Sequence, residues 1–349
     1  MSPLSTTPLL VFAVCVIAHM LALKLFPRIG LLDFPERYNL KRKRLPYPTG
    51  VLAVLTFFVT FLILNLHNMS MQDTGLMIGI ALLGISCFID DRAQLSPKIR
   101  LTLHVLIALL LFATGTRIYT ITNPTGLLAS SFFKLDTLII HAPLFGNLPV
   151  WSGVFTVVWL LLTINALNWF DGIPGQVSLL SVIGFLTIGF LSLSSRVNQP
   201  DLALIAFILA GIALACFLFD FPPPHVVLGD SGSMFFGLML GTLTIFAGGK
   251  VATAFLVLGV PLVDSFFVII RRLLSGRSPL RGSQSGEHLH HRLLAKGWSP
   301  KQVILLTASI GFLFGGTALF LSSFQKVIAA ASLFVIMLLL SWYSAPVKK

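Results

Sequence analysis

The chain has 349 residues, of which 56% are hydrophobic and only 10% are charged, and its mean hydropathy is +0.93. A composition this apolar excludes a soluble globular fold and is typical of a polytopic membrane protein. The formal net charge is +12, but the basic residues stand in short loops beside apolar segments. We therefore expect the membrane and phosphate-bearing substrates as partners, and no nucleic acid.

Apolar segments follow one another along the chain, each near the roughly 20 residues with which a helix crosses a bilayer. They predict an all-α polytopic integral membrane protein with about eleven transmembrane helices, in a single transmembrane domain over residues 1–349. No Lys or Arg precedes the first segment, so we expect this segment to be retained rather than cleaved as a signal peptide. The segments are 8–26, 48–66, 74–89, 100–120, 150–167, 176–193, 201–218, 232–247, 251–270, 302–322 and 327–345.

The distribution of Lys and Arg predicts the orientation of the chain. With the amino terminus outside, five loops and the carboxyl terminus share one side of the membrane, and that side carries 19 of the 24 basic residues. The positive-inside rule makes it the cytoplasmic side of a plasma or inner membrane. On the other side, segment 121–149 predicts a small extracytoplasmic hairpin. The predicted cytoplasmic loops are 27–47, 90–99, 168–175, 219–231 and 271–301.

Two adjacent carboxylates, Asp90 and Asp91, stand where the third apolar segment meets the predicted cytoplasm. Adjacent carboxylates repel each other, so holding both ionised usually requires a cation. A hard ion such as Mg²⁺, carrying substrate phosphates, would supply the charge. From these two residues alone, a solvated pair at the end of a helix remains the alternative.

A second polar motif runs from Asn165 to Gly172. Asn165 and Asn168 are three residues apart and share a helical face, and Asp171 follows at the membrane boundary. Carboxamides can read the edge of a nucleobase while the carboxylate reaches a metal. Asn and Asp also end helices for structural reasons, so the motif alone leaves both interpretations open.

A third motif, Gly229-Asp230-Ser231-Gly232-Ser233, opens an apolar segment. It presents backbone amides, the positive end of a helix dipole and one carboxylate together, which are the ingredients for holding a metal-bound phosphate. An ordinary helix cap is the alternative.

One further acid, Asp264, lies inside a predicted span. A carboxylate at that depth is costly unless it is paired. It is therefore either a functional group or half of a structural ion pair.

The loop 271–301 combines the sequence Glu287-His288-Leu289-His290-His291-Arg292 with several further guanidinium groups. Arg offers planar bidentate donors, and His supplies donors that are neutral or charged near neutral pH. Such a loop can cradle a pyrophosphate. The alternative is a basic loop at the membrane surface that only sets topology.

Together and in this order, the motifs resemble those of the polyprenyl-phosphate N-acetylhexosamine-1-phosphate transferases of glycosyltransferase family 4. The His-Leu-His-His sequence is closer to the WecA and TagO type, which transfers N-acetylglucosamine 1-phosphate to undecaprenyl phosphate, than to the MraY branch, whose loop typically has three consecutive His. The motifs are Asp90-Asp91 with Leu95-Ser96-Pro97, Asn165 to Gly172, Gly229 to Ser233, Pro261 with Asp264, Arg271-Arg272 with Gly276 to Pro279, and His288 to Leu293.

The resemblance implies a cytoplasmic active site, a Mg²⁺ or Mn²⁺ cofactor and a UDP-N-acetylhexosamine donor. The products would be polyprenyl-diphospho-sugar and UMP, in the first membrane step of a cell-surface glycan pathway. Dimers are common in this family, so the resemblance allows a homodimer, but the sequence does not determine the oligomeric state. The implied catalytic residues are Asp90, Asp91, Asp171 and His291; the implied metal ligands are Asp230, Asp91 and Asp171; the implied substrate-binding residues are Asn165, Asn168, Arg271, Arg272, Arg277, His288, His290 and Arg292.

Pro174, Gln176, Asp220 and His225 depart from the family pattern. The departures leave the sugar open, with UDP-N-acetylmuramoyl-pentapeptide among the candidates. Two other classes are weighed against the transferase. An anionic-solute transporter would place its ionisable groups near the bilayer midplane, whereas here they crowd one surface. A non-catalytic lipid-sugar binding protein would have no need of the carboxylates, which are all present.

Overall fold

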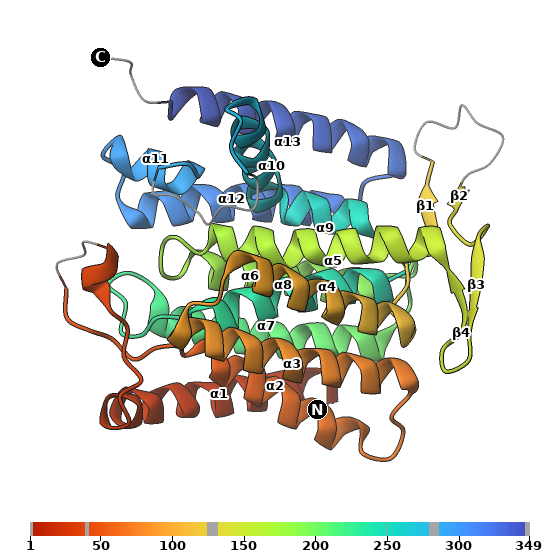
Figure 1. The fold of residues 1–349 in the computed structure, drawn as a ribbon, viewed down its shortest axis with the longest axis horizontal. Helices are drawn as coiled ribbons and strands as arrows, with labels where there is room; N and C mark the ends of the chain where they lie inside the picture. The colour runs from red at the N-terminus through yellow and green to blue at the C-terminus, as the bar shows by residue number, and fades with distance from the viewer. Residues whose placement is uncertain (1–2, 39–41, 124–131, 249, 279–285, 346–349) are drawn as a thin grey trace.

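The computed structural model describes residues 3–38, 42–123, 132–248, 250–278 and 286–345. In this part of the chain, most helices run side by side along one axis, and short strands lie at one end of the bundle (Figure 1). The helices are α1 (Pro3–Arg28), the 3-10 helix η1 (Pro35–Tyr38), α2 (Gly50–Asn65), α3 (Met71–Ala93), α4 (Pro97–Ala113), α5 (Val150–Phe170), α6 (Gln176–Leu193), α7 (Pro200–Asp220), α8 (Asp230–Phe246), α9 (Val251–Val257), α10 (Gly259–Leu274), α11 (Leu289–Ala295), α12 (Pro300–Ala318) and α13 (Ser323–Tyr343); the strands are β1 (Thr120–Thr122), β2 (Phe132–Lys134), β3 (Ile139–Ala142) and β4 (Gly146–Pro149).

Among the described residues, seven helices are long and apolar enough to cross a membrane: α1, α3, α5, α6, α7, α12 and α13. The pair α9 and α10 makes an eighth span if it is counted as one, and α2 and α8 are apolar but shorter. The expectation of a mostly helical, multi-span membrane protein is confirmed. The count of eleven spans stays a prediction, because α2, α4 and α8 have only 16 or 17 residues each.

Segment 251–270, which the sequence predicts as one span, bends by 85° between α9 and α10. Pro261 explains the break. It has no N–H to donate to the carbonyl of Val257, and its ring clashes with that carbonyl in a regular helix. Helical hydrogen bonds form on either side of it, from Leu258 N–H to Ala254 O (2.8 Å) and from Leu262 N–H to Leu258 O (3.0 Å).

Helix α8 is the centre of the bundle, and every residue from Ser231 to Ile245 is buried. It packs against α2, α3 and α5. The approach to α5 is close enough that a Cβ at Gly237 would lie 2.6 Å from the carbonyl oxygen of Thr163. The approach to α2 is closer still, since a Cβ at Gly50 would lie 2.1 Å from the nitrogen of Gly232. Glycine contacts therefore fix the start of α8.

The strands form two antiparallel pairs, β1 with β2 and β3 with β4, in the segment that the sequence predicts as a hairpin. Ile139 pairs with Pro149 and Ala142 with Gly146, so β3 and β4 form a tight hairpin. Residues 124–131 of this segment lie outside the described residues, as do parts of the predicted loops 27–47 and 271–301. The extracytoplasmic position of the strands stays a prediction.

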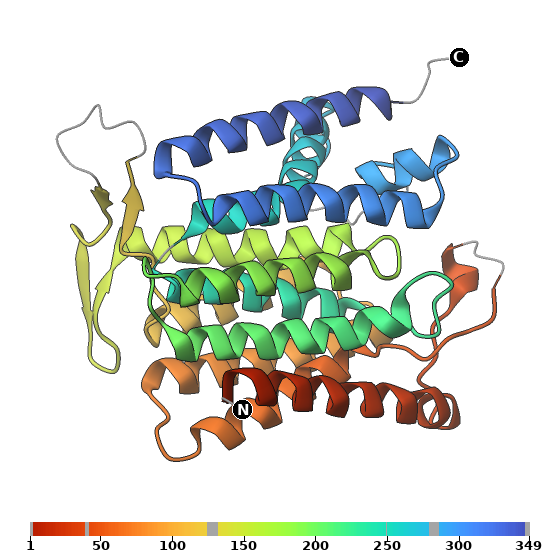
Figure 2. The ribbon, with the colours of Figure 1, turned by 180° about the vertical axis from the view of Figure 1, so that it is seen from behind.

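The predicted cytoplasmic loops gather at the end of the bundle opposite the strands, as Figures 1 and 2 show from two sides. The first of these loops is joined to the segment before α8, where Val227 N–H donates to Pro46 O (3.0 Å) and Thr49 N–H donates to Val227 O (3.0 Å). The first loop and the segment before α8 therefore lie together at this end of the bundle.

Candidate active site

Asp91, at the end of α3, holds the start of α8. Its Oδ1 accepts hydrogen bonds from the Tyr47 hydroxyl (2.6 Å) and the Asp230 N–H (2.9 Å). Its Oδ2 accepts the N–H (3.1 Å) and the hydroxyl of Ser231. Four donors use the lone-pair sites of a carboxylate, and three of them belong to the first two residues of α8. Asp91 is thus an N-terminal cap supplied by another helix.

The turn before α8 requires glycine. Gly229 has φ +79°, and a Cβ there would lie 2.8 Å from the Tyr47 ring and from Pro48, and 3.1 Å from the Asp91 carboxylate. The motif that suggests a phosphate-binding turn is therefore packed against the first loop and the end of α3. The side chain of Asp230 contacts Asn168 and Arg100.

Arg100, in the first turn of α4, joins two of the acids. Its Nη1 donates to Asp90 Oδ2 (3.1 Å) and to Asp230 Oδ2 (3.2 Å). The other oxygen of Asp90 accepts Leu95 N–H (2.6 Å), so the backbone after α3 fixes this carboxylate. Our sequence-based site omits Arg100. The signal that could have found it is a guanidinium at the first residue of an apolar segment, a few residues after a pair of acids.

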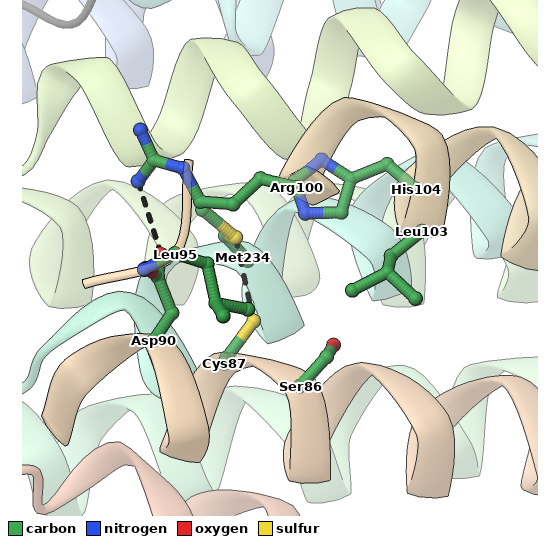
Figure 3. A pocket seen from close by; sticks show the side chains of 8 residues that line it. All are labelled: Ser86, Cys87, Asp90, Leu95, Arg100, Leu103, His104 and Met234. Carbon is green, nitrogen blue, oxygen red and sulfur yellow. Dashed lines mark hydrogen bonds and ion pairs between the residues drawn. The ribbon is translucent and has the colours of Figure 1, made fainter. Parts of the chain in front are cut away.

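A small cavity lies beside Asp90 and Arg100, between α3, α4 and α8 (Figure 3). Its volume is about 10 Å³, which is room for one water molecule. Nothing larger than a water molecule fits in it. The cavity is lined by Ser86, Cys87, Asp90, Leu95, Arg100, Leu103, His104 and Met234.

The end of α5 supplies the second partner of Asp230. Asn168 Nδ2 donates to Asp230 Oδ1 (2.8 Å) and to the Ser233 hydroxyl (3.3 Å). Asn165 lies one turn deeper, beside His104, with its Nδ2 donating to the carbonyl of Leu161 (2.8 Å). Both carboxamides thus lie on the side of α5 that faces α4 and α8, but only Asn168 reaches the acids.

Asp171 follows α5 and is half-buried beside the other carboxylates. Burial raises the pKa of Asp171 well above its usual range, and the charges of Asp220, Asp230 and Asp91 raise it further. This end of the bundle therefore concentrates negative charge that a bound cation would offset.

Asp264 of α10 organises the histidine motif. Its Oδ2 accepts a hydrogen bond from His288 Nδ1 (2.8 Å), and its Oδ1 accepts the Leu289 N–H (3.0 Å) at the start of α11. Both side chains are almost fully buried. The carboxylate thereby fixes the tautomer of His288, with the proton on Nδ1, and caps α11 at the same time.

His290 packs against the turn after α5. A Cβ at Gly172 would lie 1.9 Å from His290 Nε2, so only glycine fits there. The His290 ring stacks on His288, with 5.7 Å between ring centroids. It is 1% exposed, and neither ring nitrogen has a hydrogen-bond partner in the described part of the chain. Burial lowers the pKa of His290 well below its usual range.

His291 is the most open of the three imidazoles. It is half-buried, with its ring centroid 4.2 Å from that of His290. Burial and the neighbouring His288 lower its pKa as well. His290 and His291 are therefore neutral at neutral pH, and each presents one N–H donor and one acceptor.

The predicted guanidinium groups divide into two kinds. Arg272 pairs with Glu287 (Nε to Oε2 3.1 Å) and lies over the Trp169 ring. Arg292 donates to the Ser341 carbonyl (3.1 Å), and burial lowers its pKa to about 10, which leaves it charged. These two hold the loop together.

The other two predicted arginines, Arg271 and Arg277, make fewer contacts with the described residues. Arg271 donates from Nε to the Phe267 carbonyl (3.1 Å), while its Nη2 is buried with no partner among the described residues. Arg277 is exposed, and no described contact joins its side chain to the cluster. Arg271 therefore keeps a donor for a ligand.

The end of α5 joins the acidic cluster to the histidine motif. Asn168 contacts Asp230, while Trp169 lies beside His288 (6.0 Å between ring centroids) and Gly172 against His290. The structure thus brings together most of the predicted site residues around one short segment: Asp90, Asp91, Asn168, Asp171, Asp230, Arg271, Arg272, His288, His290, His291 and Arg292. Asn165 lies at its edge and Arg277 outside it.

The carboxylates of the site fit a magnesium ion that binds together with a phosphate-bearing substrate. Within the described residues, no three His, Cys, Asp or Glu side chains gather in a metal-binding arrangement. Mg²⁺ commonly takes only one or two carboxylates and completes its shell with water and phosphate oxygens. Asp230, whose side chain is 30% exposed, and the neighbouring Asp171 can supply those carboxylates. Asp91 has no lone pair left for this task.

A bundle of apolar helices with carboxylates, imidazoles and guanidinium groups at one end defines a membrane protein that handles phosphate-bearing molecules. Comparison with protein families narrows this class. The model of glycosyl transferase family 4 matches residues 73–248, about half of the chain, and the protein belongs to this family. The matched region includes Asp90, Asp91, Asn168, Asp171 and Asp230.

Individual relatives match over most of the chain. The protein is 28% identical over 320 residues to the probable undecaprenyl-phosphate N-acetylglucosaminyl 1-phosphate transferase of Bacillus subtilis (strain 168), covering 90% of this chain and 82% of that protein. It is 25% identical over 334 residues to the undecaprenyl-phosphate alpha-N-acetylglucosaminyl 1-phosphate transferase of Escherichia coli (strain K12), covering 88% and 83%. It is 27% identical over 283 residues to the phospho-N-acetylmuramoyl-pentapeptide-transferase of Clostridium beijerinckii, covering 77% and 80%.

Proposed function

We propose that the protein transfers N-acetylglucosamine 1-phosphate from its UDP-sugar to polyprenyl phosphate, with polyprenyl-diphospho-N-acetylglucosamine and UMP as products. The observation that carries the proposal is Asp230, held by Asn168 and Arg100 beside the histidine motif, with its side chain still open. The names of the Bacillus and Escherichia relatives support this sugar and this acceptor.

The acceptor needs little activation. A phosphate monoester has a second pKa of about 6, so a lipid phosphate is already largely a dianion at neutral pH. One of its oxygens attacks the β-phosphorus of the UDP-sugar, the new O–P bond forms, and the bond to UMP breaks with the electrons leaving on UMP. Both oxygens of Asp90 are engaged, by Leu95 and by Arg100. This favours direct transfer over a covalent phospho-aspartate.

The main catalytic task is to bring two anionic groups together and to stabilise the leaving UMP. Preorganised cations and N–H donors perform this task best when they are fixed before the substrate arrives. Arg100 is fixed by two carboxylates, and His288 by Asp264. We assign to the diphosphate the half-buried His291 and the Nη2 group of Arg271, which is buried and has no hydrogen-bond partner among the described residues.

Asp230 and Asp171 would hold Mg²⁺ in this proposal. The ion would neutralise phosphate charge and polarise the phosphoryl oxygens. Asp91 we assign to positioning, because its four hydrogen bonds fix the first turn of α8, from which Asp230 projects. Asn168 orients Asp230 from the opposite side.

The proposal includes the topology: a plasma or inner membrane protein with the site facing the cytoplasm, the amino terminus outside and the carboxyl terminus inside. The excess of Lys and Arg in the loops at the site's end of the bundle supports this orientation. A cytoplasmic site also has access to UDP-sugars.

The test is UMP release by the purified protein in detergent, with undecaprenyl phosphate and Mg²⁺, across a panel of UDP-sugars. We expect release with UDP-N-acetylglucosamine that requires the lipid and stops on chelation. Release only with UDP-N-acetylmuramoyl-pentapeptide would keep the reaction and replace the sugar. No release with any donor, from a monodisperse protein supplied with Mg²⁺ or Mn²⁺, would refute the function.

A further inference from the structure

Three basic side chains converge at the end of the bundle opposite the candidate active site. They are Arg196 in the connection from α6 to α7, Lys250 at the start of α9, and Lys326 in the first turn of α13. The three segments are far apart in sequence but lie at the same end, the end that carries the strands (Figure 1). Only five of the 24 basic residues fall at this end, so the convergence of three of them is not explained by a generally basic surface.

Hydrogen bonds connect these three segments. Arg196 Nη1 donates to the Leu321 carbonyl (3.3 Å), in the turn that leads into α13. Lys326 Nζ donates to the Thr253 hydroxyl of α9 (2.8 Å). The Thr253 N–H in turn donates to the Lys250 carbonyl (3.0 Å). The side chains of Arg196 and Lys326 are thus held by neutral oxygens, and a backbone hydrogen bond fixes the position of Lys250.

The charges in this cluster are unbalanced. The charged groups that act most strongly on Lys326 are Lys250 and Arg196, and both are cations. Of the acids at this end, Asp73 forms a capping box with Ser70 at the start of α3. No described contact joins Asp136 or Asp201 to the cluster. Repulsion among three cations, two of them half-buried, is costly unless an anion binds between them.

The surroundings of the cluster identify the kind of anion. Phe320 and Phe324, on either side of the turn that Arg196 contacts, are 80% and 56% exposed. Exposed Phe rings gain free energy against lipid acyl chains, and the long side chains of Lys and Arg beside them can reach the headgroup layer. Basic pockets between transmembrane helices bind the phosphates of anionic lipids. A free anion would gain nothing from the exposed rings.

We infer that Arg196, Lys250 and Lys326 form a binding site for the phosphate of an anionic phospholipid, at the membrane surface opposite the active site. The site is separate from the transfer reaction, since none of its residues lies near Asp230 or the histidine motif. Its occupant stabilises α13 against α9 by neutralising the repulsion between Lys326 and Lys250.

The test measures lipid binding to the full-length protein in neutral detergent by native mass spectrometry, with phosphatidylglycerol and phosphatidylcholine as probes. We expect preferential retention of phosphatidylglycerol. Lys326→Gln and Lys250→Gln should each weaken it by about fivefold, the effect of one cation at a lipid surface. Lys326→Arg should retain it. Lys134→Gln, which removes an exposed lysine of β2 at the same end, is the matched control and should leave it unchanged.

Two results would overturn the inference. One is retention of phosphatidylglycerol by Lys326→Gln and Lys250→Gln at the level of the unchanged protein, with UMP release showing that the variants are folded. The other concerns the source of the phosphate group. A thermal stabilisation by inorganic phosphate as large as that by phosphatidylglycerol, at matched ionic strength, would assign the cluster to a free anion instead of a lipid.

Discussion

The carboxylate of Asp91 accepts the backbone N–H of Asp230 at 2.9 Å, so one acid of the site holds the backbone of another. Asp91→Asn keeps the shape of the side chain but replaces one acceptor by an NH₂ group facing the donors of Ser231. We expect a loss of stability of about 1–2 kcal/mol, the usual effect of losing a helix cap, together with a loss of transfer. Thermal unfolding in detergent measures the first effect. Unchanged thermal stability with abolished transfer would instead indicate a direct role for Asp91 in binding the metal or the substrate.

Asp230→Asn should abolish transfer without unfolding the protein. The side chain is open, and a carboxamide can keep the hydrogen bond with Asn168, but the charge that holds a cation is lost. We expect a fall in turnover of at least about a hundredfold. Asp136→Asn is the matched control, since Asp136 is an exposed acid at the strand end of the bundle, and it should have little effect. Near-normal turnover in folded Asp230→Asn would refute the assignment.

Arg100→Lys keeps the positive charge of the side chain but changes its geometry, whereas Arg100→Gln removes the charge. The guanidinium contacts Asp90 and Asp230 together, whereas an ammonium on a flexible stem contacts such a pair less precisely. Turnover should fall from Arg through Lys to Gln, because Gln leaves two neighbouring carboxylates without a neutralising cation. Steady-state UMP release gives the order. Equal turnover in all three would show that the bridge contributes nothing to catalysis.

Gly172→Ala should disturb the histidine motif. The added Cβ would meet His290 Nε2 at 1.9 Å, so either the imidazole or the turn has to move. Displacement of positioning groups by about 1 Å can cost up to about a hundredfold in rate. Gly316→Ala makes the same chemical change in α12, where nothing lies within 4 Å of the added Cβ, and should leave UMP release unchanged. Equal activity of the two variants would contradict the packing.

The stability of the protein should depend on the buried imidazole of His290. Its pKa is lowered in the folded state by burial, so below its ordinary pKa the unfolded chain binds more protons than the folded one. Stability therefore falls as the pH drops below about 6.5, the ordinary pKa of histidine. His290→Gln should show a shallower fall between about pH 6.5 and 5. Thermal unfolding at several pH values tests this, and identical pH profiles would argue against a buried neutral His290.

The sequence predicts the loops that meet and the acids they carry, because charged residues in an apolar chain are rare and stand out. It does not predict which acid holds which partner. The sequence predicts Asp91 as half of a metal-binding pair. In the structure its carboxylate instead accepts hydrogen bonds from Tyr47 and Ser231, which are 44 and 140 residues away in sequence. Arg100 was missed for the same reason, since one of its two partners, Asp230, is 130 residues away.

Packing is the other part that the sequence leaves open. Pro261 is visible in the sequence, but whether a proline kinks a span or breaks it depends on its neighbours, and here the two halves diverge by 85°. Cys15 and Cys216 have no paired spacing, yet their thiols contact each other between α1 and α7. Both features depend on which helices become neighbours, which local pattern does not determine.

Asp264 lies on α10, one turn beyond the proline that breaks the span, and it holds both His288 and the first N–H of α11. The short helix with the imidazoles therefore moves with α10 as one body, although 14 residues separate the two helices in sequence. The carboxylate of Asp264 therefore sets the position of the imidazoles relative to α10. A change in the angle of α10 is then expected to carry the imidazoles with it.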